Sequence, residues 1–142
     1  ICGAIVEGLK ELGVEAEFKP VNDISAGGKK ISGNAQTRRH GVVLQHGTVL
    51  VDSDIRTMFR VLRVSDAKIS DKMIKAVEER VTNVRRYLGR KVSFTEARDA
   101  LVSGFEETFD MSLKPGRLTA GEERTVEELK AKYTSPEWVH QR

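Results

Sequence analysis

Residues 21–37 read VNDISAGGKKISGNAQT and residues 42–51 read VVLQHGTVLV, and these two stretches decide the expected fold. Gly27-Gly28 divides the first stretch, because a glycine pair supplies the positive φ angles of a two-residue hairpin turn. We therefore expect strands at 21–26 and 29–37. The run at 42–51 is apolar at odd and even positions alike, which predicts a third strand covered on both faces.

The Gly27-Gly28 turn also predicts the register of the first hairpin. Ser25 pairs with Lys30 and Asp23 with Ser32 if both strands are regular. Directly opposed side chains share a face of the sheet, and so do positions two apart. One face is therefore expected to carry four polar side chains: Asp23, Ser25, Lys30 and Ser32.

The second hairpin is expected to turn through a loop at 38–40. His46 then lies opposite Ser32, and Thr48 lies opposite Lys30. A two-residue loop would turn the third strand over. The prediction is a lysine, a carboxylate, a histidine and hydroxyl groups gathered on one face.

Small residues dominate the other face of the second strand, where Gly33 and Ala35 fall. Glycine within a strand often marks a close approach by a ligand, and Gly47 repeats the sign. A lysine here needs an anionic partner such as a carboxylate or phosphate. Lys30 suits a group on which negative charge develops, and Asp23 suits a magnesium ion or a ribose hydroxyl. Taken singly, each residue also has an ordinary structural explanation, so spacing alone supports no more than a candidate anion site.

The remaining pattern is mainly helical. Ser93 with Glu96, and Thr119 with Glu122, have the spacing of a capping box. The expected elements outside the two hairpins are helices at 1–13, 54–62, 70–84, 93–109 and 119–133, and short strands at 15–20 and 111–114. The fold class is therefore α/β (α+β), with a mixed or antiparallel sheet flanked by helices.

Composition limits the class of protein. The chain has 142 residues, 32% of them charged, and a net charge of +3. Residues 55–92 hold eleven Lys or Arg and four Asp or Glu, which suits an acidic partner, although a solvated basic helix pair explains the count equally well. Sparse aromatic residues and the lack of a known motif argue against nucleic acid. No run approaches the roughly 20 apolar residues of a membrane span, and a lone cysteine, Cys2, favours the cytoplasm.

Three motifs, in this order, resemble the lipoate–protein ligase family within the biotin and lipoate ligase fold, which is similar to class II synthetases. They are Asn22-Asp23-Ile24, Lys30-Ile31-Ser32-Gly33-Asn34-Ala35 and His46-Gly47-Thr48. Residues 80–83 and 132–133 also resemble later family segments, less specifically. The resemblance identifies residues 1–142 as the C-terminal portion of a catalytic domain. The Arg-Arg and glycine-rich half of that domain is absent from this chain.

The resemblance implies an ATP-dependent reaction. Lipoate and ATP, with Mg²⁺, give lipoyl-AMP, and the lipoyl group then passes to a lysine of a lipoyl-domain acceptor. Such acceptors are the E2 subunit of 2-oxoacid dehydrogenases and the glycine cleavage H protein. A separate accessory domain, or the missing N-terminal segment, is a further expected partner.

By position, the resemblance makes Lys30 the catalytic lysine that grips the acyl carbonyl and the phosphate. It places Asn22 and Asp23 near the adenylate, with Asp23 the candidate Mg²⁺ ligand. The other residues implied to bind substrate or adenylate are Ser32, Gly33, Ala35, His46, Gly47 and Thr48.

Three alternatives remain. An octanoyl or lipoyl transferase of the same fold uses a cysteine nucleophile and no ATP, but Cys2 lies far in pattern from Lys30. Biotin ligase shares the fold and chemistry, but its motifs match less closely. A non-catalytic basic binding module is the alternative from a different class.

Overall fold

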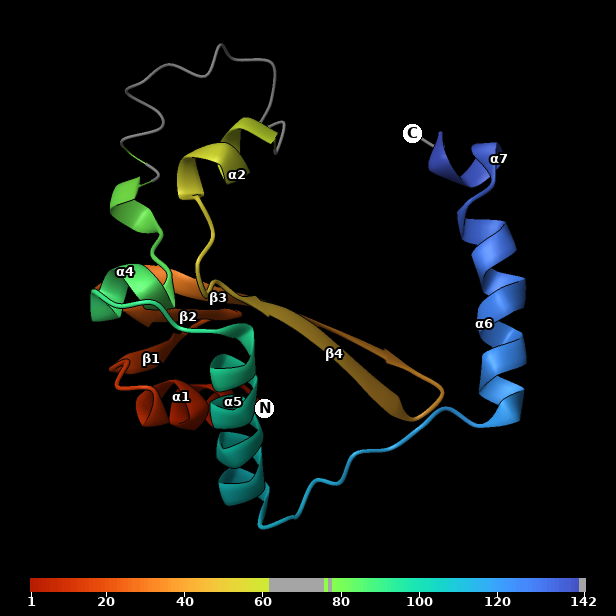
Figure 1. Cartoon of the computed structure of the whole chain (residues 1–142), viewed down its shortest axis with the longest axis horizontal. Coiled ribbons are helices and arrows are strands. Elements are labelled where there is room, and N and C mark those ends of the chain that lie inside the picture. The colour runs from red at the N-terminus through yellow and green to blue at the C-terminus, as the bar shows by residue number, and fades with distance from the viewer. Residues whose placement is uncertain (62–75, 77, 141–142) are drawn as a thin grey trace. The chain divides into compact units, whose positions relative to one another are not determined.

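The computed structural model describes residues 1–61, 76 and 78–140. The chain divides into two units, Ile1–Ser112 and Leu113–Arg142, which we treat separately. The first contains α1 (Cys2–Glu11), β1 (Ala16–Lys19), β2 (Asp23–Ala26), β3 (Lys29–Arg39), β4 (Val42–Val49), α2 (Ile55–Val61), α4 (Val84–Leu88) and α5 (Phe94–Phe109) (Figure 1). The second contains α6 (Ala120–Tyr133) and α7 (Pro136–Val139).

The four strands form one antiparallel sheet in the order β1-β2-β3-β4. The predicted fold class is confirmed, because this sheet is flanked by helices. Gly27 and Gly28 have φ angles of 56° and 74°, so the first hairpin turns where the sequence predicts. The second hairpin differs from the prediction: its turn is formed by two residues, His40 and Gly41, with φ angles of 52° and 74°.

β4 is an edge strand, and the prediction that it is covered on both faces is wrong for the described residues. Val42, Val43 and Leu44 have exposed fractions of 64%, 48% and 61%. Figure 1 shows the β3–β4 hairpin extending beyond α1 and α5, so within the described part of the first unit no layer covers this half of β4. An apolar run therefore occurs here on a strand that the described part of the chain leaves uncovered.

The core lies between the sheet and two helices, α1 and α5, which lie against one another (Figure 1). The fully buried side chains from the first unit include Leu9 of α1, Ile24 of β2 and Ile31 of β3. The helices approach closely because small residues face each other, with Gly8 of α1 in contact with Ala100 and Gly104 of α5. One face of the sheet is thereby buried, which leaves the other face for a site.

Helix ends follow the predicted caps. Ser93 Oγ accepts a hydrogen bond from the Glu96 amide at 3.0 Å, and Thr119 with Glu122 forms a complete capping box. One prediction fails nearby. Residues 111–114 do not form a strand: the chain leaves α5 through Asp110 in a left-handed conformation. The helix predicted for 70–84 lies largely outside the described residues; the described residues 76 and 78–80 are helical, but Val81 forms a β-bridge and Val84 begins α4.

No helix among the described residues combines the length and the apolar character needed to cross a membrane.

Candidate functional site

Lys30 and Asp23 form an ion pair on the face of the sheet that α1 and α5 leave open. Lys30 Nζ lies 2.6 Å from Asp23 Oδ1, and the two side chains have exposed fractions of 44% and 34%. Asp23 Oδ1 is itself buried and makes no hydrogen bond to a described residue, so the lysine charge is its compensation. The ammonium therefore remains within reach of a ligand while a carboxylate positions it.

Gly33 provides the room for this lysine. A Cβ atom at Gly33 would lie 3.0 Å from Lys30 Cε, 3.1 Å from Lys30 Nζ and 3.8 Å from Asp23 Oδ1. Any side chain would thus press on the lysine. The glycine that the sequence associates with a ligand slot has a second role, because the Lys30 side chain crosses over it.

A β-bulge sets this arrangement and corrects the predicted register. Ser25 pairs with Lys30 as expected, but Asp23 pairs with Gly33 and Ile24 pairs with Ser32, because the register shifts between Ile24 and Ser25. An extra residue in one strand changes which side chains share a face. Gly33 consequently joins Asp23 and Lys30, and Ser32 does not.

The second hairpin turns through two residues instead of the expected three, and this shift exchanges the two faces of β4 relative to the prediction. Ala35 pairs with His46 and Gly33 pairs with Thr48, so the predicted pairings of His46 with Ser32 and of Thr48 with Lys30 are wrong. The bulge in β3 and the shorter turn each exchange the faces once, however, so their effects on the position of β4 side chains relative to Lys30 offset each other. His46 and Thr48 still lie on the face of Lys30, where both are exposed.

Ser32 belongs to a buried amide network on the opposite face. Ser32 is fully buried, and its hydroxyl accepts a hydrogen bond from Asn34 Nδ2 at 3.1 Å. Asn34 also accepts from Gln45 Nε2 at 3.4 Å and packs against Gly47, where a Cβ atom would collide with the Asn34 side chain. Ser32 and Gly47 are therefore separated from the lysine by the sheet itself.

A groove opens where β3 continues past the end of β2. Asn22 bridges this point, donating from Nδ2 to the Asn34 carbonyl at 2.5 Å and accepting from the Asn34 amide at 2.9 Å. The groove has a volume of 840 Å³ and is lined by Ile1, Cys2, Gly3, Phe18, Val21, Asn22, Asn34, Ala35, Gln36 and Gln45. Two predicted site residues, Asn22 and Ala35, thus line this groove, and Ala35, which pairs with His46, also lies on the face of Lys30.

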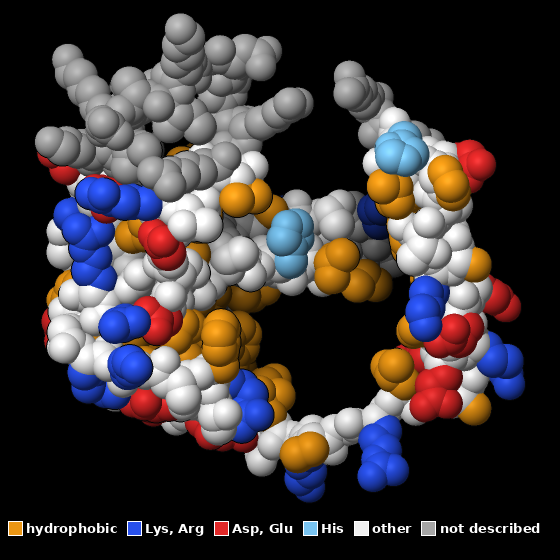
Figure 2. All heavy atoms as spheres, turned by 45° about the horizontal axis from the view of Figure 1, so that its top comes forward, with side chains coloured by type: hydrophobic (Ala, Val, Ile, Leu, Met, Phe, Trp, Pro, Cys, Tyr) orange, Lys and Arg blue, Asp and Glu red, His pale blue; other side chains and the backbone are white. Residues whose placement is uncertain are grey.

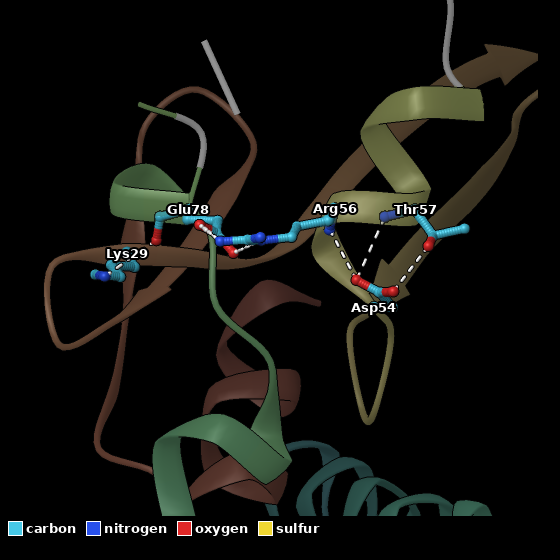
Figure 3. A network of polar contacts seen from close by, with 5 residues as sticks. All are labelled: Lys29, Asp54, Arg56, Thr57 and Glu78. Atoms are coloured by element: carbon cyan, nitrogen blue, oxygen red, sulfur yellow. Dashed lines mark hydrogen bonds and ion pairs between the residues drawn. The ribbon is translucent and has the colours of Figure 1, made fainter. Parts of the chain in front are cut away.

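Sequence reasoning singled out residues 80–83 as similar to a family segment but did not place them beside Lys30, which they border on its other side. The Thr82 amide donates to the Lys30 carbonyl at 2.9 Å, and Lys29 Nζ donates to the Glu78 carbonyl at 3.1 Å. Figure 3 shows Lys29 and Arg56 meeting Glu78 from two sides, with the Arg56 and Glu78 side chains joined at 2.8 Å. The contacts of Lys29 with Glu78 and of Lys30 with Thr82 join residues about 50 positions apart, so no local sequence pattern predicts them.

Hydrogen bonds shift two carboxyl groups of this network (Figure 3). The hydrogen bond from Arg56 holds the pKa of Glu78 below its usual value, and the charges of Arg56 and Arg86 act in the same direction. Hydrogen bonds from the Thr57 side chain and backbone lower the pKa of Asp54, which begins α2. Both groups are therefore charged at neutral pH.

Arg56→Gln is expected to return the pKa of Glu78 toward its usual value near 4.5. Because the folded pKa is the lower one, the pair contributes stability above the unfolded pKa, and this is lost as pH falls through the folded pKa. Carboxyl carbon chemical shifts measured against pH test the prediction. Glu96 is the internal control, since a hydrogen bond from Arg90 lowers its pKa and should still do so in the variant. An unchanged Glu78 titration would contradict the prediction.

The donor set gives a limited fit to a magnesium ion. Among the described residues, no three His, Cys, Asp or Glu side chains lie close enough together to hold a metal. Magnesium often uses one or two protein carboxylates together with substrate phosphates, so Asp23 alone is compatible with it. The Lys30 ammonium must then move away from Asp23, since both cations compete for the same carboxylate.

The sequence of this chain matches one known protein family. The model of the lipoyl protein ligase A/B catalytic domain matches residues 1–106. Octanoyltransferase LipM of Kyrpidia tusciae is 34% identical over the whole chain and 60% of its own length. Lipoate-protein ligase A subunit 1 of Thermoplasma acidophilum is 38% identical over 95% of the chain and 55% of its own length. The chain therefore spans little more than half of these relatives.

Solved structures agree with the sequence comparison. The bi-partite lipoate protein ligase of Thermoplasma acidophilum, studied with its E2 lipoyl domain, has a TM-score of 0.86 and 38% identity, covering 96% of this chain and 54% of that one. A lipoate-protein ligase A bound with ATP has a TM-score of 0.79 and 35% identity, covering 96% of this chain and 55% of that one. The chain belongs to the lipoyl protein ligase A/B catalytic domain family.

Proposed function

We propose that this chain carries the lysine-bearing part of an ATP-dependent lipoate–protein ligase, which forms lipoyl-AMP and transfers the lipoyl group to a lysine of an acceptor protein. The observation that supports this most directly is the Lys30–Asp23 ion pair, which leaves a half-exposed ammonium on the open face of the sheet. A positioned cation is the group that both steps require, because negative charge develops on the phosphate and then on the acyl oxygen.

In this proposal Lys30 exchanges its partner when substrates bind. The ammonium moves from Asp23 to the acyl carbonyl and α-phosphate oxygens, and Asp23 is the residue that would hold a magnesium ion, which would supply charge neutralisation. Gly33 leaves the space in which the lysine moves. Ala35, His46 and Thr48 border the same face, and Asn22 contributes from the neighbouring groove. Ser32 and Gly47 act only from the opposite face, by fixing the strands.

The position of the cysteine favours a ligase over a transferase for this chain. Its single cysteine, Cys2, begins α1, and Cys2 Sγ lies 4.0 Å from Gln45 Nε2, on the side of the sheet away from Lys30. A thiolate that attacks an acyl group held by Lys30 must reach the same face. The LipM relatives are transferases by name, so the transferase is the second candidate, with its nucleophile outside these residues.

Lipoyl-domain proteins are the acceptors in this proposal, and a second subunit or domain completes the site. The bi-partite neighbour, described with its E2 lipoyl domain, supports both points. The reaction consumes ATP, so the proposed location is the cytoplasm.

The full-length protein is expected to catalyse lipoate-dependent exchange of pyrophosphate into ATP. A ligase forms the acyl-adenylate reversibly and therefore exchanges, whereas a cysteine transferase or a binding module does not. Radiolabelled pyrophosphate measures the exchange, and omitting lipoate is the control. ATP-independent acyl transfer without exchange would identify the second candidate and would refute the ligase.

A further inference from the structure

A basic surface lies next to the Lys30 strand, and the proposed reaction does not use it. Its residues lie on both sides of Thr82, whose amide donates to the Lys30 carbonyl. The Val84 and Arg85 amides hold this segment to the chain that follows β4, by donating to the Leu50 and Val51 carbonyls. We call it the basic edge: Arg80, Arg85, Arg86, Arg90 and Lys91. Figure 2 shows Lys and Arg side chains gathered on the side of the first unit where α4 lies.

Part of this charge is uncompensated. Arg85 pairs with Asp52 at 3.0 Å and Arg90 pairs with Glu96 at 2.8 Å. Arg80, Arg86 and Lys91 are exposed, and none of them forms an ion pair with another residue in the described part of the chain. Net positive charge of this kind attracts an acidic surface and accelerates association with it.

The basic edge also has a shape that can receive a side chain. Asp52, Asn83, Arg85, Arg86 and Gly89 line a hollow of 350 Å³. Arg86 lines it with a guanidinium group that is not ion-paired within the described residues, whereas the guanidinium of Arg85 is held by Asp52, and guanidinium groups bind carboxylates through paired hydrogen bonds. Asn83, which lines the hollow, directly follows Thr82, whose amide donates to the Lys30 carbonyl. A partner bound in the hollow would therefore lie close to the strand residue that carries the proposed catalytic side chain.

We infer that the basic edge docks the acidic face of the acceptor domain and so presents the acceptor lysine to the acyl group at Lys30. The inference rests on the proposed function. Asp52 and Glu96 alternate with the arginines, and such alternation suits a protein surface of mixed charge better than the uniformly negative backbone of a nucleic acid. An acidic protein domain is therefore the occupant that the charges favour.

The test is Arg86→Gln/Lys91→Gln in the full-length enzyme, with an acidic apo-lipoyl domain as the probe. The KM for the lipoyl domain is expected to rise about tenfold at low salt and to depend less on ionic strength, because two attractive charges are gone. The lipoate-dependent exchange rate should stay unchanged. Lys114→Gln/Arg117→Gln removes the same charge from the second unit and is the matched control.

Each outcome separates the inference from the proposed function. Direct titration of the lipoyl domain onto the enzyme needs no adenylate, so it tests docking even if exchange fails in the wild-type protein. Equal affinities of the wild-type and Arg86→Gln/Lys91→Gln proteins would overturn the inference. So would a fall in exchange, which would assign these residues to the nucleotide, or a selective loss of binding to a duplex oligonucleotide. A lipoyl domain whose acidic residues are made neutral should bind the wild-type enzyme less tightly but lose little further affinity for the Arg86→Gln/Lys91→Gln protein, and this non-additivity would support it.

Discussion

Lys30→Ala is expected to lower lipoate-dependent pyrophosphate exchange by about two to three orders of magnitude, the usual cost of removing one group that stabilises a developing oxyanion. The side chain is half exposed and its ion pair spans two adjacent strands, so the fold should survive its removal. Lys30→Arg should not restore the rate, because a planar guanidinium is larger and would press on Gly33. Exchange rates at saturating ATP and lipoate measure the effect.

Lys10→Ala is the matched control for this experiment. Lys10 is also a lysine paired with a carboxylate, with its Nζ 3.3 Å from Glu7 Oε2, but it lies on α1, which packs on the face of the sheet opposite to Lys30. Its loss should leave the exchange rate unchanged. Full activity in the Lys30→Ala protein, with circular dichroism unaltered, would remove Lys30 from its proposed role.

Gly104→Ala is expected to destabilise the protein by about 3 kcal/mol, at the upper end for an overpacked core. A Cβ at Gly104 would lie 2.5 Å from the Ala4 carbonyl oxygen and 2.7 Å from Gly8 Cα, which are backbone atoms that cannot rotate away. The two helices must therefore separate. Urea unfolding followed by circular dichroism measures the change in the free energy of unfolding.

Gly3→Ala is the control for the helix pair. Gly3 lies in α1, and nothing stands within 4 Å of a Cβ at that position. Alanine should be neutral or stabilise the protein by about 0.5–1 kcal/mol, because it loses less conformational freedom in a helix than glycine does. A Gly104→Ala protein as stable as Gly3→Ala would mean that α1 and α5 do not pack as closely as described.

Local signals account for the part of the fold that sequence predicts. Gly27-Gly28 and the capping residues Ser93 and Thr119 act within a few positions of themselves, and each lies where expected. The short helix α7 carried such a signal too, a serine cap followed by proline at 135–136, and it was missed. Signals of this kind determine where elements begin and end, independently of what packs against them.

Strand register and burial could not be predicted in this way, because they depend on the strands and layers that lie beside each strand. No residue pattern announces the shift between Ile24 and Ser25, and the turn at His40-Gly41 requires a positive φ at a residue other than glycine. β4 is apolar, but its exposure depends on which layer stands beside it. The candidate site was nevertheless recognisable, because its two register errors offset each other for His46 and Thr48. Ser32, expected beside Lys30, lies on the opposite face, and Gly33 and Ala35, expected on that opposite face, lie on the face of Lys30.

The bulge gives the spacing of the lysine motif a geometric meaning. On a regular strand, two residues three positions apart point to opposite sides, so Lys30 and Gly33 could never meet. The one extra residue between them changes the phase of the strand, and the lysine then folds back over the glycine. Lys-x-x-Gly is thus an odd interval that only an irregular strand can use. The same residues on a regular strand would keep every chemical group and still turn Gly33 away from Lys30, so the motif specifies a local irregularity of the backbone as much as a set of side chains.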